Sequence, residues 1–214
     1  MGGMSAQVIA KTNPKEINDK ALDGVKKDKE RELNQGNDGA WVAHPSLVQP
    51  VKNIFEKNFK GKSQLNKFND TKISRRDLLD EPKIENAISE KGIRENLNEG
   101  IEYMAFWMIG TGCCVVNYLM ADAATCEVSR AQLWIWLKYK AKLNDGRAID
   151  EKLIDELITD ELEKIRKKFS SWKERTGDKS LDHVSFESAA KIFKDMITKE
   201  NFDNFLTLPL YEKI

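Results

Sequence analysis

This sequence has few cysteines and histidines, and it has no net charge. Its 214 residues include three cysteines and two histidines, and 35 basic side chains balance 35 acidic ones. Cys113 and Cys114 are adjacent and Cys126 stands apart, a spacing that fits neither a zinc site nor the disulfide framework of a secreted domain. A net charge of zero gives no general attraction to nucleic acid or to an acidic membrane.

Long apolar runs and targeting signals are also missing. The most apolar stretches, residues 104–109 and 113–121, fall short of the roughly 20 residues that a membrane helix needs. The N-terminus has no basic region followed by a long apolar one, and Ala6 stands where a myristoylation signal would have Ser or Thr. The final Glu-Lys-Ile is not a peroxisomal signal. We therefore expect a cytoplasmic protein with no membrane or nucleic-acid partner.

Beyond residue 46 the chain is patterned as helix. Apolar residues recur at helical spacing, and capping residues precede the periodic segments at Ser74, Ser89, Asp150 and Ser185. In the segment 123–142 the side chains expected to face inward are Val128, Ala131, Trp134, Ile135 and Leu137. The pattern predicts a mainly α fold, with a helical domain of about five helices over residues 46–214.

The first 45 residues follow a different pattern. Residues 1–12 are expected to be extended, and the pair Gly2-Gly3 indicates a close approach of the backbone to another group. A helix is expected to start at Asn13-Pro14 and to end near Gly36. The nearly all-apolar run 40–45 predicts a strand covered on both faces, as in a parallel sheet. No further good strand follows, so its neighbours are expected to be missing.

Few residues are candidates for chemistry. Asp122 stands between an apolar run and a helical segment, so it is either a helix N-cap or a general base. His44, at the end of the predicted strand, could line a site. The cysteines have no obvious histidine partner, which favours buried packing. Gly110-Thr111-Gly112 lacks the spacing of a phosphate loop. These residues alone favour a helical interaction module over an enzyme.

Several stretches together resemble one enzyme family. Residues 117–130 resemble the catalytic-loop signature of malate synthases, Asn-Leu-Met-Glu-Asp-Ala-Ala-Thr-Ala-Glu-Ile-Ser-Arg. Residues 38–45 resemble the family's Asp-Gly-Thr-Trp-Val-Ala-His-Pro strand. Residues 1–7 and 205–209 are similar to an internal and a C-terminal motif, and all the matches occur in family order. The resemblance covers nearly the whole chain.

The resemblance implies a TIM (β/α)8 barrel followed by a C-terminal helical plug, and the condensation of acetyl-CoA with glyoxylate to malate and CoA, with Mg2+. Asp122 matches the catalytic base, while His44 and Pro45 match a strand end near the acetyl-CoA pocket. In such enzymes the metal-binding acids and a substrate-binding arginine lie upstream of Met1. We therefore expect residues 1–45 to be a barrel remnant, residues 46–214 to be the plug, and no metal ligand in this chain.

The sequence also departs from the malate synthase signature. Because of these departures, two alternative functions remain for the chain. Ala121 replaces the glutamate that precedes the catalytic aspartate, Val115 replaces a proline, and Asn117-Tyr118 reverses the usual order. The chain is predicted to be a C-terminal fragment of a malate synthase, with a separate barrel-encoding chain as its possible partner. The alternative is a non-catalytic helical interaction module left from such an enzyme.

Overall fold

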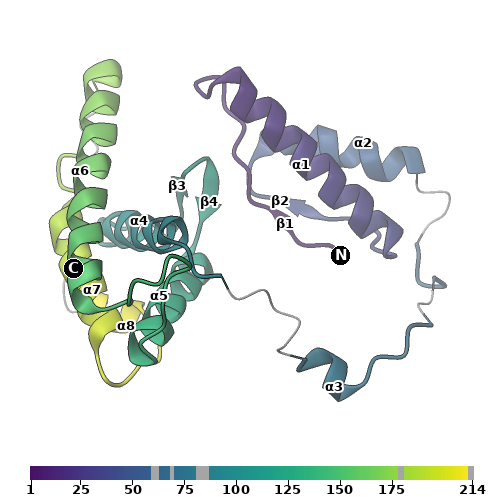
Figure 1. The fold of residues 1–214 in the computed structure, drawn as a ribbon. Helices are drawn as coiled ribbons and strands as arrows, with labels where there is room; N and C mark the ends of the chain where they lie inside the picture. The colour runs from purple at the N-terminus through teal and green to yellow at the C-terminus, as the bar shows by residue number, and fades with distance from the viewer. Residues whose placement is uncertain (59–62, 68–69, 81–86, 178–180, 212–214) are drawn as a thin grey trace. The chain divides into compact units, whose positions relative to one another are not determined.

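The computed structural model describes residues 1–58, 63–67, 70–80, 87–177 and 181–211 (Figure 1). Its contacts divide the chain into two compact units. Unit 1 comprises Met1–Ile84 and Asn117–Met120, and unit 2 comprises Glu85–Val116 and Ala121–Ile214. The domain boundary suggested by the sequence, after residue 45, stays a prediction.

Unit 1 is built on a parallel pair of short strands. Strand β1 (Met4–Ser5) pairs with β2 (Trp41–Val42), and helix α1 (Lys15–Asn34) forms the crossover between them (Figure 1). The 3-10 helix η1 (Pro45–Leu47), helix α2 (Val48–Asn58) and the single-turn helix α3 (Arg75–Leu78) follow. The predicted helix after Asn13-Pro14 is confirmed. The predicted strand at residues 40–45 is confirmed only at Trp41–Val42, because His44 and Pro45 already begin η1.

The glycine pair at the start of β1 contacts a buried ion pair. A Cβ atom on Gly2 would lie 2.0 Å from Oε2 of Glu32, and the Gly3 amide donates to Oε1 of the same side chain at 2.9 Å. Lys29, which is fully buried, donates from Nζ to the Gly3 carbonyl at 2.7 Å and to both Glu32 oxygens at 3.0 Å. The close backbone approach predicted for this pair is confirmed, and the partner is Glu32.

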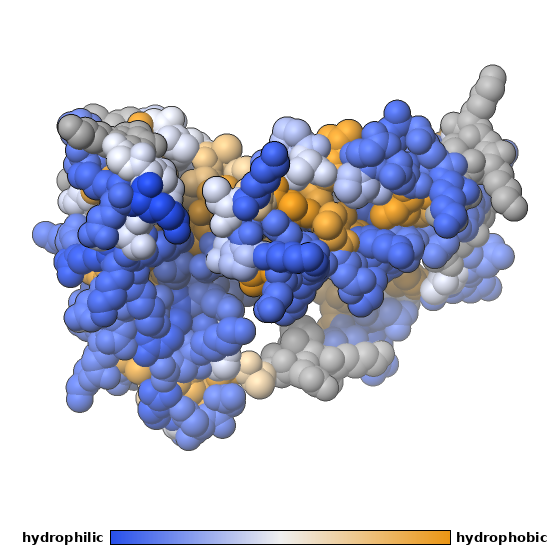
Figure 2. All heavy atoms as spheres, turned by 90° about the horizontal axis from the view of Figure 1, so that it is seen from above, coloured by the Kyte–Doolittle hydropathy of each residue, from blue (hydrophilic) through white to orange (hydrophobic). Residues whose placement is uncertain are grey.

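The expectation that β2 is covered on both faces is wrong for this chain. The Trp41 side chain is 54% exposed. In the described part of the chain β2 has one strand neighbour, β1, and about half of this indole is left uncovered. Apolar side chains are also visible among the hydrophilic ones in the space-filling view (Figure 2).

Unit 2 is a helical bundle with well-capped helices. Its helices are α4 (Glu90–Trp107), α5 (Ala123–Lys138), α6 (Glu151–Thr176), α7 (Phe186–Thr198) and α8 (Thr207–Leu210). The side chains of Ser89, Asp122, Asp150 and Ser185 each accept a hydrogen bond from the backbone amide three residues later. The caps predicted at Ser89, Asp150 and Ser185 are confirmed, as is the cap of α3 at Ser74.

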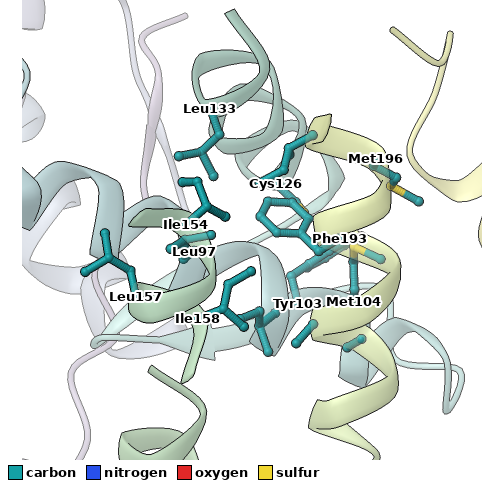
Figure 3. Packing of buried hydrophobic residues seen from close by; sticks show 14 of the residues in the cluster. Leu97, Tyr103, Met104, Cys126, Leu133, Ile154, Leu157, Ile158, Phe193 and Met196 are labelled. Atoms are coloured by element: carbon teal, nitrogen blue, oxygen red, sulfur yellow. The ribbon is translucent and has the colours of Figure 1, made fainter. Parts of the chain in front are cut away.

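The core of unit 2 lies where α4, α5, α6 and α7 meet (Figure 3). Leu97, Tyr103 and Met104 of α4 pack with side chains from the other three helices. Helix α7 can approach α4 closely because of Gly100, since a Cβ atom there would lie 2.2 Å from Cζ of Phe193. The absence of a side chain at this position therefore sets the spacing of two core helices.

Helix α5 buries only part of the face that was expected. Leu137 is half-buried and packs against the core, as predicted. Val128 and Ile135 are 57% and 46% exposed, so the prediction that they face inward is wrong. The buried side chains of the helix are Cys126, Ser129, Arg130 and Leu133. Because α5 carries apolar residues on more than one side, periodicity could not identify the buried face.

A short hairpin precedes α5, where the sequence analysis expected no strand. Strands β3 (Cys114–Val116) and β4 (Leu119–Ala121) pair with each other and are joined by Asn117 and Tyr118. Both turn residues have positive φ angles, 49° and 66°. Two consecutive left-handed residues match the tight turn whose twist fits a two-residue hairpin, and asparagine suits this conformation well.

None of the helices in the described residues is both long and apolar enough to pass through a bilayer.

We predict that Gly100→Ala destabilises unit 2 by about 1–3 kcal/mol, because the added methyl overlaps the Phe193 ring in a packed core. Gly92→Ala on the same helix is the matched control, since its Cβ would make only an ordinary contact, 3.4 Å from Oγ of Ser89. Urea unfolding followed by circular dichroism measures both variants. Equal stabilities for the two would contradict the packing assigned to Gly100.

Candidate functional site

Asp122 caps helix α5. Its Oδ1 accepts a hydrogen bond from the backbone amide of Thr125 at 3.0 Å and another from the Thr125 hydroxyl at 3.1 Å. The Asp122 amide lies 3.5 Å from the same hydroxyl, which completes a capping box. These two bonds to the carboxylate both fall on Oδ1, and neither uses Oδ2. The capping interpretation of Asp122 is therefore confirmed, and it does not occupy the whole carboxylate.

The hairpin tip before Asp122 is bound to the end of strand β1. Within unit 1, the Val8 amide donates to the Tyr118 carbonyl at 2.9 Å, and the Met120 amide donates to the Ala6 carbonyl at 2.7 Å. Gln7 and Leu119 form an antiparallel bridge between these bonds. Since Asp122 follows Met120 by two residues, the chain reaches Asp122 directly from the carboxyl end of β1.

The segment after β2 lies at the same end of the sheet. Strands β1 and β2 are parallel, with Ser5 opposite Val42, and the Ala43 amide donates to the Ser5 carbonyl at 2.9 Å. The residues that follow each strand, Ala6–Val8 and Ala43–Pro45, therefore share one edge. In α/β barrels, functional side chains come from the loops at this edge.

His44 has a local structural role at this edge. It is the N-cap of η1, where its Nδ1 accepts from the Ser46 amide at 3.2 Å and lies 2.7 Å from the Ser46 hydroxyl. The same hydroxyl donates to the Ile9 carbonyl at 3.1 Å, and Pro45 occupies the first turn of η1. These contacts link the segments after β1 and β2. A role of His44 and Pro45 near acetyl-CoA stays a prediction.

In unit 2, a buried carboxylate of α4 pairs with α6. Glu102 is fully buried, and its two oxygens accept from Nζ of Lys168 at 2.8 and 2.7 Å. The pKa of Glu102 is nevertheless raised, because its burial outweighs the attraction of Lys168. Lys168 of α6 thus provides this buried carboxyl group with hydrogen bonds and an opposite charge.

One helical turn earlier on α4, Glu99 is half-buried and close to other acids. Burial raises the pKa of Glu99 to about 7, and the negative charges of Glu102 and Asp122 add to the rise while Lys168 opposes it. Helix caps do not usually lie close to a carboxyl group that titrates near neutral pH, as Asp122 does to Glu99. Sequence reasoning did not identify Glu99.

The thiols divide into one exposed and two buried groups. Cys113 is exposed, whereas Cys114 and Cys126 are buried. Burial raises the pKa of Cys114 to about 12 and raises the pKa of Cys126 well above its ordinary value. Buried thiols of this kind are not nucleophiles at neutral pH, so the packing role predicted for the cysteines is confirmed for these two. Cys113 does not fit that prediction.

Two buried polar atoms near the end of β1 have no protein partner. In the described part of the chain, Oγ of Ser5 and Oε1 of Gln7 are buried without a hydrogen bond. Buried polar groups are normally paired, so such atoms call for an explanation. Within the described part of the chain, no group of three or more His, Cys, Asp or Glu side chains could hold a metal ion.

Comparison with known proteins decides the family. Residues 87–214 match the family described as "Malate synthase, C-terminal", and residues 1–81 match "Malate synthase, TIM barrel domain". The chain is 40% identical over 215 residues to a "Malate synthase" of Myxococcus xanthus (strain DK1622), with all of this chain and 38% of that protein aligned. This chain belongs to the malate synthase family.

Other relatives extend the malate synthase match. A "Bifunctional glyoxylate cycle protein" of Caenorhabditis elegans is 38% identical over 100% of this chain and 21% of its own length. A "Malate synthase, glyoxysomal" of Glycine max is 37% identical over 100% of this chain and 37% of its own length. The chain thus spans less than two fifths of each of these relatives. It corresponds to the C-terminal portion of a malate synthase.

The predicted fold class is confirmed by these matches. The chain is mainly helical, and the tail of a TIM barrel, residues 1–81, precedes the C-terminal helical domain of malate synthases. The roles of individual side chains are not tested by the family match. Asp122 as a general base therefore stays a prediction, and it is taken up below.

The structure adds candidate residues that no sequence pattern marked. Glu99 and Glu102 lie on a helix whose residues Gly100–Ala105 are all buried, and the one acid inside that run was the available signal. Lys168 lies on α6, distant in sequence, so nothing local marked it as the partner of Glu102.

We predict that Glu99→Gln raises stability at about pH 8 by about 1 kcal/mol, a value reduced for solvent screening of a half-exposed group. Because the pKa of Glu99 is raised from 4.5 to about 7, the folded carboxyl keeps a proton that the unfolded one loses. Wild-type stability therefore falls as the pH rises through that window, and Gln removes this loss.

The gain should shrink toward zero near pH 5, where the Glu99 carboxyl is mostly protonated when folded. The control is Glu95→Gln, an exposed acid on the same helix paired with Lys91 at 3.5 Å. Urea unfolding of both variants at the two pH values provides the measurement. A Glu99→Gln effect of the same size at both would be inconsistent with the raised pKa.

Proposed function

We propose that this chain is the catalytic-loop portion of a malate synthase and that Asp122 is its general base. The reaction would be the condensation of acetyl-CoA with glyoxylate, followed by hydrolysis to malate and CoA. The observation that carries the proposal is the attachment of the hairpin tip to the end of β1, through Val8 to Tyr118 and Met120 to Ala6. This attachment leads the chain to Asp122 from the edge at which barrel enzymes have their sites.

The geometry of Asp122 suits proton abstraction. Its cap bonds fall on Oδ1, so Oδ2 can accept a proton from the methyl group of acetyl-CoA without uncapping α5. The proton moves from the acetyl methyl carbon to Asp122, and the carbanion electron pair forms the new carbon–carbon bond to glyoxylate.

Magnesium is part of this proposal through the family rather than through this chain. When bound, the metal would orient glyoxylate and polarise its aldehyde carbonyl. In the described residues no cluster of ligating side chains could hold it, so its ligands would come from barrel strands outside this chain. The chain's own contribution is then the proposed base, Asp122.

Three features of unit 1 support a barrel-bearing partner. Trp41 is 54% exposed on a strand with one strand neighbour in the described residues. Oγ of Ser5 and Oε1 of Gln7 are buried without a partner in the same part of the chain. Parallel strands are normally covered on both faces, and buried polar atoms are normally paired. The missing strands of the barrel would supply both.

A second candidate is a non-catalytic helical interaction module. Asp122 already has a complete structural role as the cap of α5, so its presence does not require a base. Along the same helix Val128 and Ile135 are exposed, and Tyr139 at its end is 72% exposed. An apolar stripe of this kind could bind another protein without any chemistry.

Complementation tests the proposed reaction. The chain is co-expressed with the remaining N-terminal portion of the Myxococcus xanthus relative, and CoA release is measured with acetyl-CoA, glyoxylate and Mg2+. We expect turnover from the pair and none from the chain alone, because the metal ligands would lie in the partner. An inactive pair that forms a stable complex would favour the interaction module, whereas robust activity of the chain alone would contradict the fragment hypothesis.

Two substitutions at Asp122 separate capping from catalysis. Asn caps helices as well as Asp does, so Asp122→Asn should keep the stability of unit 2 and lower the rate of the complemented enzyme by at least about 100-fold. Asp122→Ala should lose the rate and also about 1 kcal/mol of stability. If Asp122→Asn retained a near-normal rate, Asp122 would be a cap only.

A further inference from the structure

Helix α5 is held from its side by the segment between α7 and α8. We define this segment, Phe202–Leu206, as the C-terminal strap. Arg130 of α5 is fully buried, and its Nη2 donates to the Asp203 carbonyl of the strap at 3.0 Å. Its guanidinium carbon lies 3.8 Å from the centre of the Phe202 ring, a cation–π contact.

A second side chain of α5 completes this attachment. Oε2 of Glu127 accepts from Nε and Nη2 of Arg130 at 2.9 and 2.5 Å. Its other oxygen, Oε1, accepts from the Leu206 amide at 2.5 Å. One carboxylate thus neutralises the buried guanidinium and also fixes the far end of the strap. Removing one member would leave the other charged and unpaired in a buried place.

The pair lies within the first turns of the helix that Asp122 caps. Glu127 and Arg130 are three residues apart, so they share one face of α5, and Trp134 continues that face one turn later. Nε1 of Trp134 donates to the Lys199 carbonyl at 2.8 Å, and its ring lies 5.0 Å from that of Phe202. The strap therefore contacts α5 along the turns that directly follow the cap.

We propose that Glu127 and Arg130 are positioning residues for Asp122, acting by fixing the first turns of α5 to the C-terminal strap. This rests on the proposed function of Asp122 as the base. A general base must be held within hydrogen-bond reach of the proton it removes, and small displacements of a helix terminus are costly to the rate. The strap makes the orientation of that terminus depend on residues 73 and 79 positions further along the chain than Arg130 and Glu127.

The test uses Arg130→Lys in the intact chain. Lysine keeps the charge beside Glu127, but it cannot bind Glu127 and the Asp203 carbonyl in a fixed fork while stacking on Phe202. Hydrogen exchange is measured at the amides of Thr125 and Cys126, which donate to Asp122. We expect both to exchange at least about tenfold faster, with the core amides of α6 unchanged, since local openings differ from global unfolding.

The matched control is Arg166→Lys, another arginine of unit 2, whose pairing with Glu187 at 2.7 Å is half-exposed. It should leave Thr125 and Cys126 unchanged. Glu127→Gln is the second variant if Arg130→Lys does not fold, because it keeps an acceptor for the Leu206 amide. Unchanged exchange at Thr125 and Cys126, or an equal acceleration at every amide, would overturn the proposal.

Activity provides a separate measurement. In the complemented enzyme, Arg130→Lys should lower kcat about tenfold with KM changed less than twofold, because a displaced base affects the reaction more than substrate binding. A rise in KM alone would contradict the positioning role. If the exchange results hold but Asp122→Asn stays active, the proposed base is wrong while the coupling of the strap to α5 stands.

Discussion

Two backbone hydrogen bonds within unit 1 hold the segment of chain that leads to the proposed base. The Val8 and Met120 amides, donating to Tyr118 and Ala6, attach the hairpin tip to the carboxyl end of β1. Because main-chain groups make these bonds, the attachment tolerates changes of side chain such as the reversed order of Asn117 and Tyr118. It requires a chain that can turn tightly, which the two left-handed residues provide.

Helix α5 is held in place at two points, its N-terminus and one side. Its N-terminus is held by a capping box that leaves one carboxylate oxygen outside the cap bonds, and its side is held by a buried ion pair. A buried guanidinium is expensive to desolvate, so such a pair contributes more to a single defined orientation than to net stability. That property suits a helix that presents a base. Glu99, with its pKa near 7, adds a nearby group whose charge changes at neutral pH.

The caps and the strand were predictable because their signals are local. Ser89, Asp150 and Ser185 cap helices as expected, and the Trp41 strand lies where its composition indicated. The buried face of α5 was not predictable, because apolar residues recur at helical spacing on two faces of this helix. Val128 and Ile135 lie on the exposed face and Leu133 lies on the buried one. The hairpin at Asn117 and the partners of Glu102 depend on residues distant in sequence. Periodicity predicted the mainly α fold, whereas the barrel origin of the first residues could be predicted only from the resemblance to malate synthases.

Native-state hydrogen exchange at Val8 and Met120 tests the attachment of the hairpin tip before Asp122 most directly. If the hairpin tip is bound to the end of β1, both amides should exchange at least about 100-fold slower than in an unstructured peptide, and with similar opening free energies. Exchange of both at the rate of an unstructured peptide would show that the loop is not attached there. In that case the proposal that Asp122 is a base would lose its main structural support.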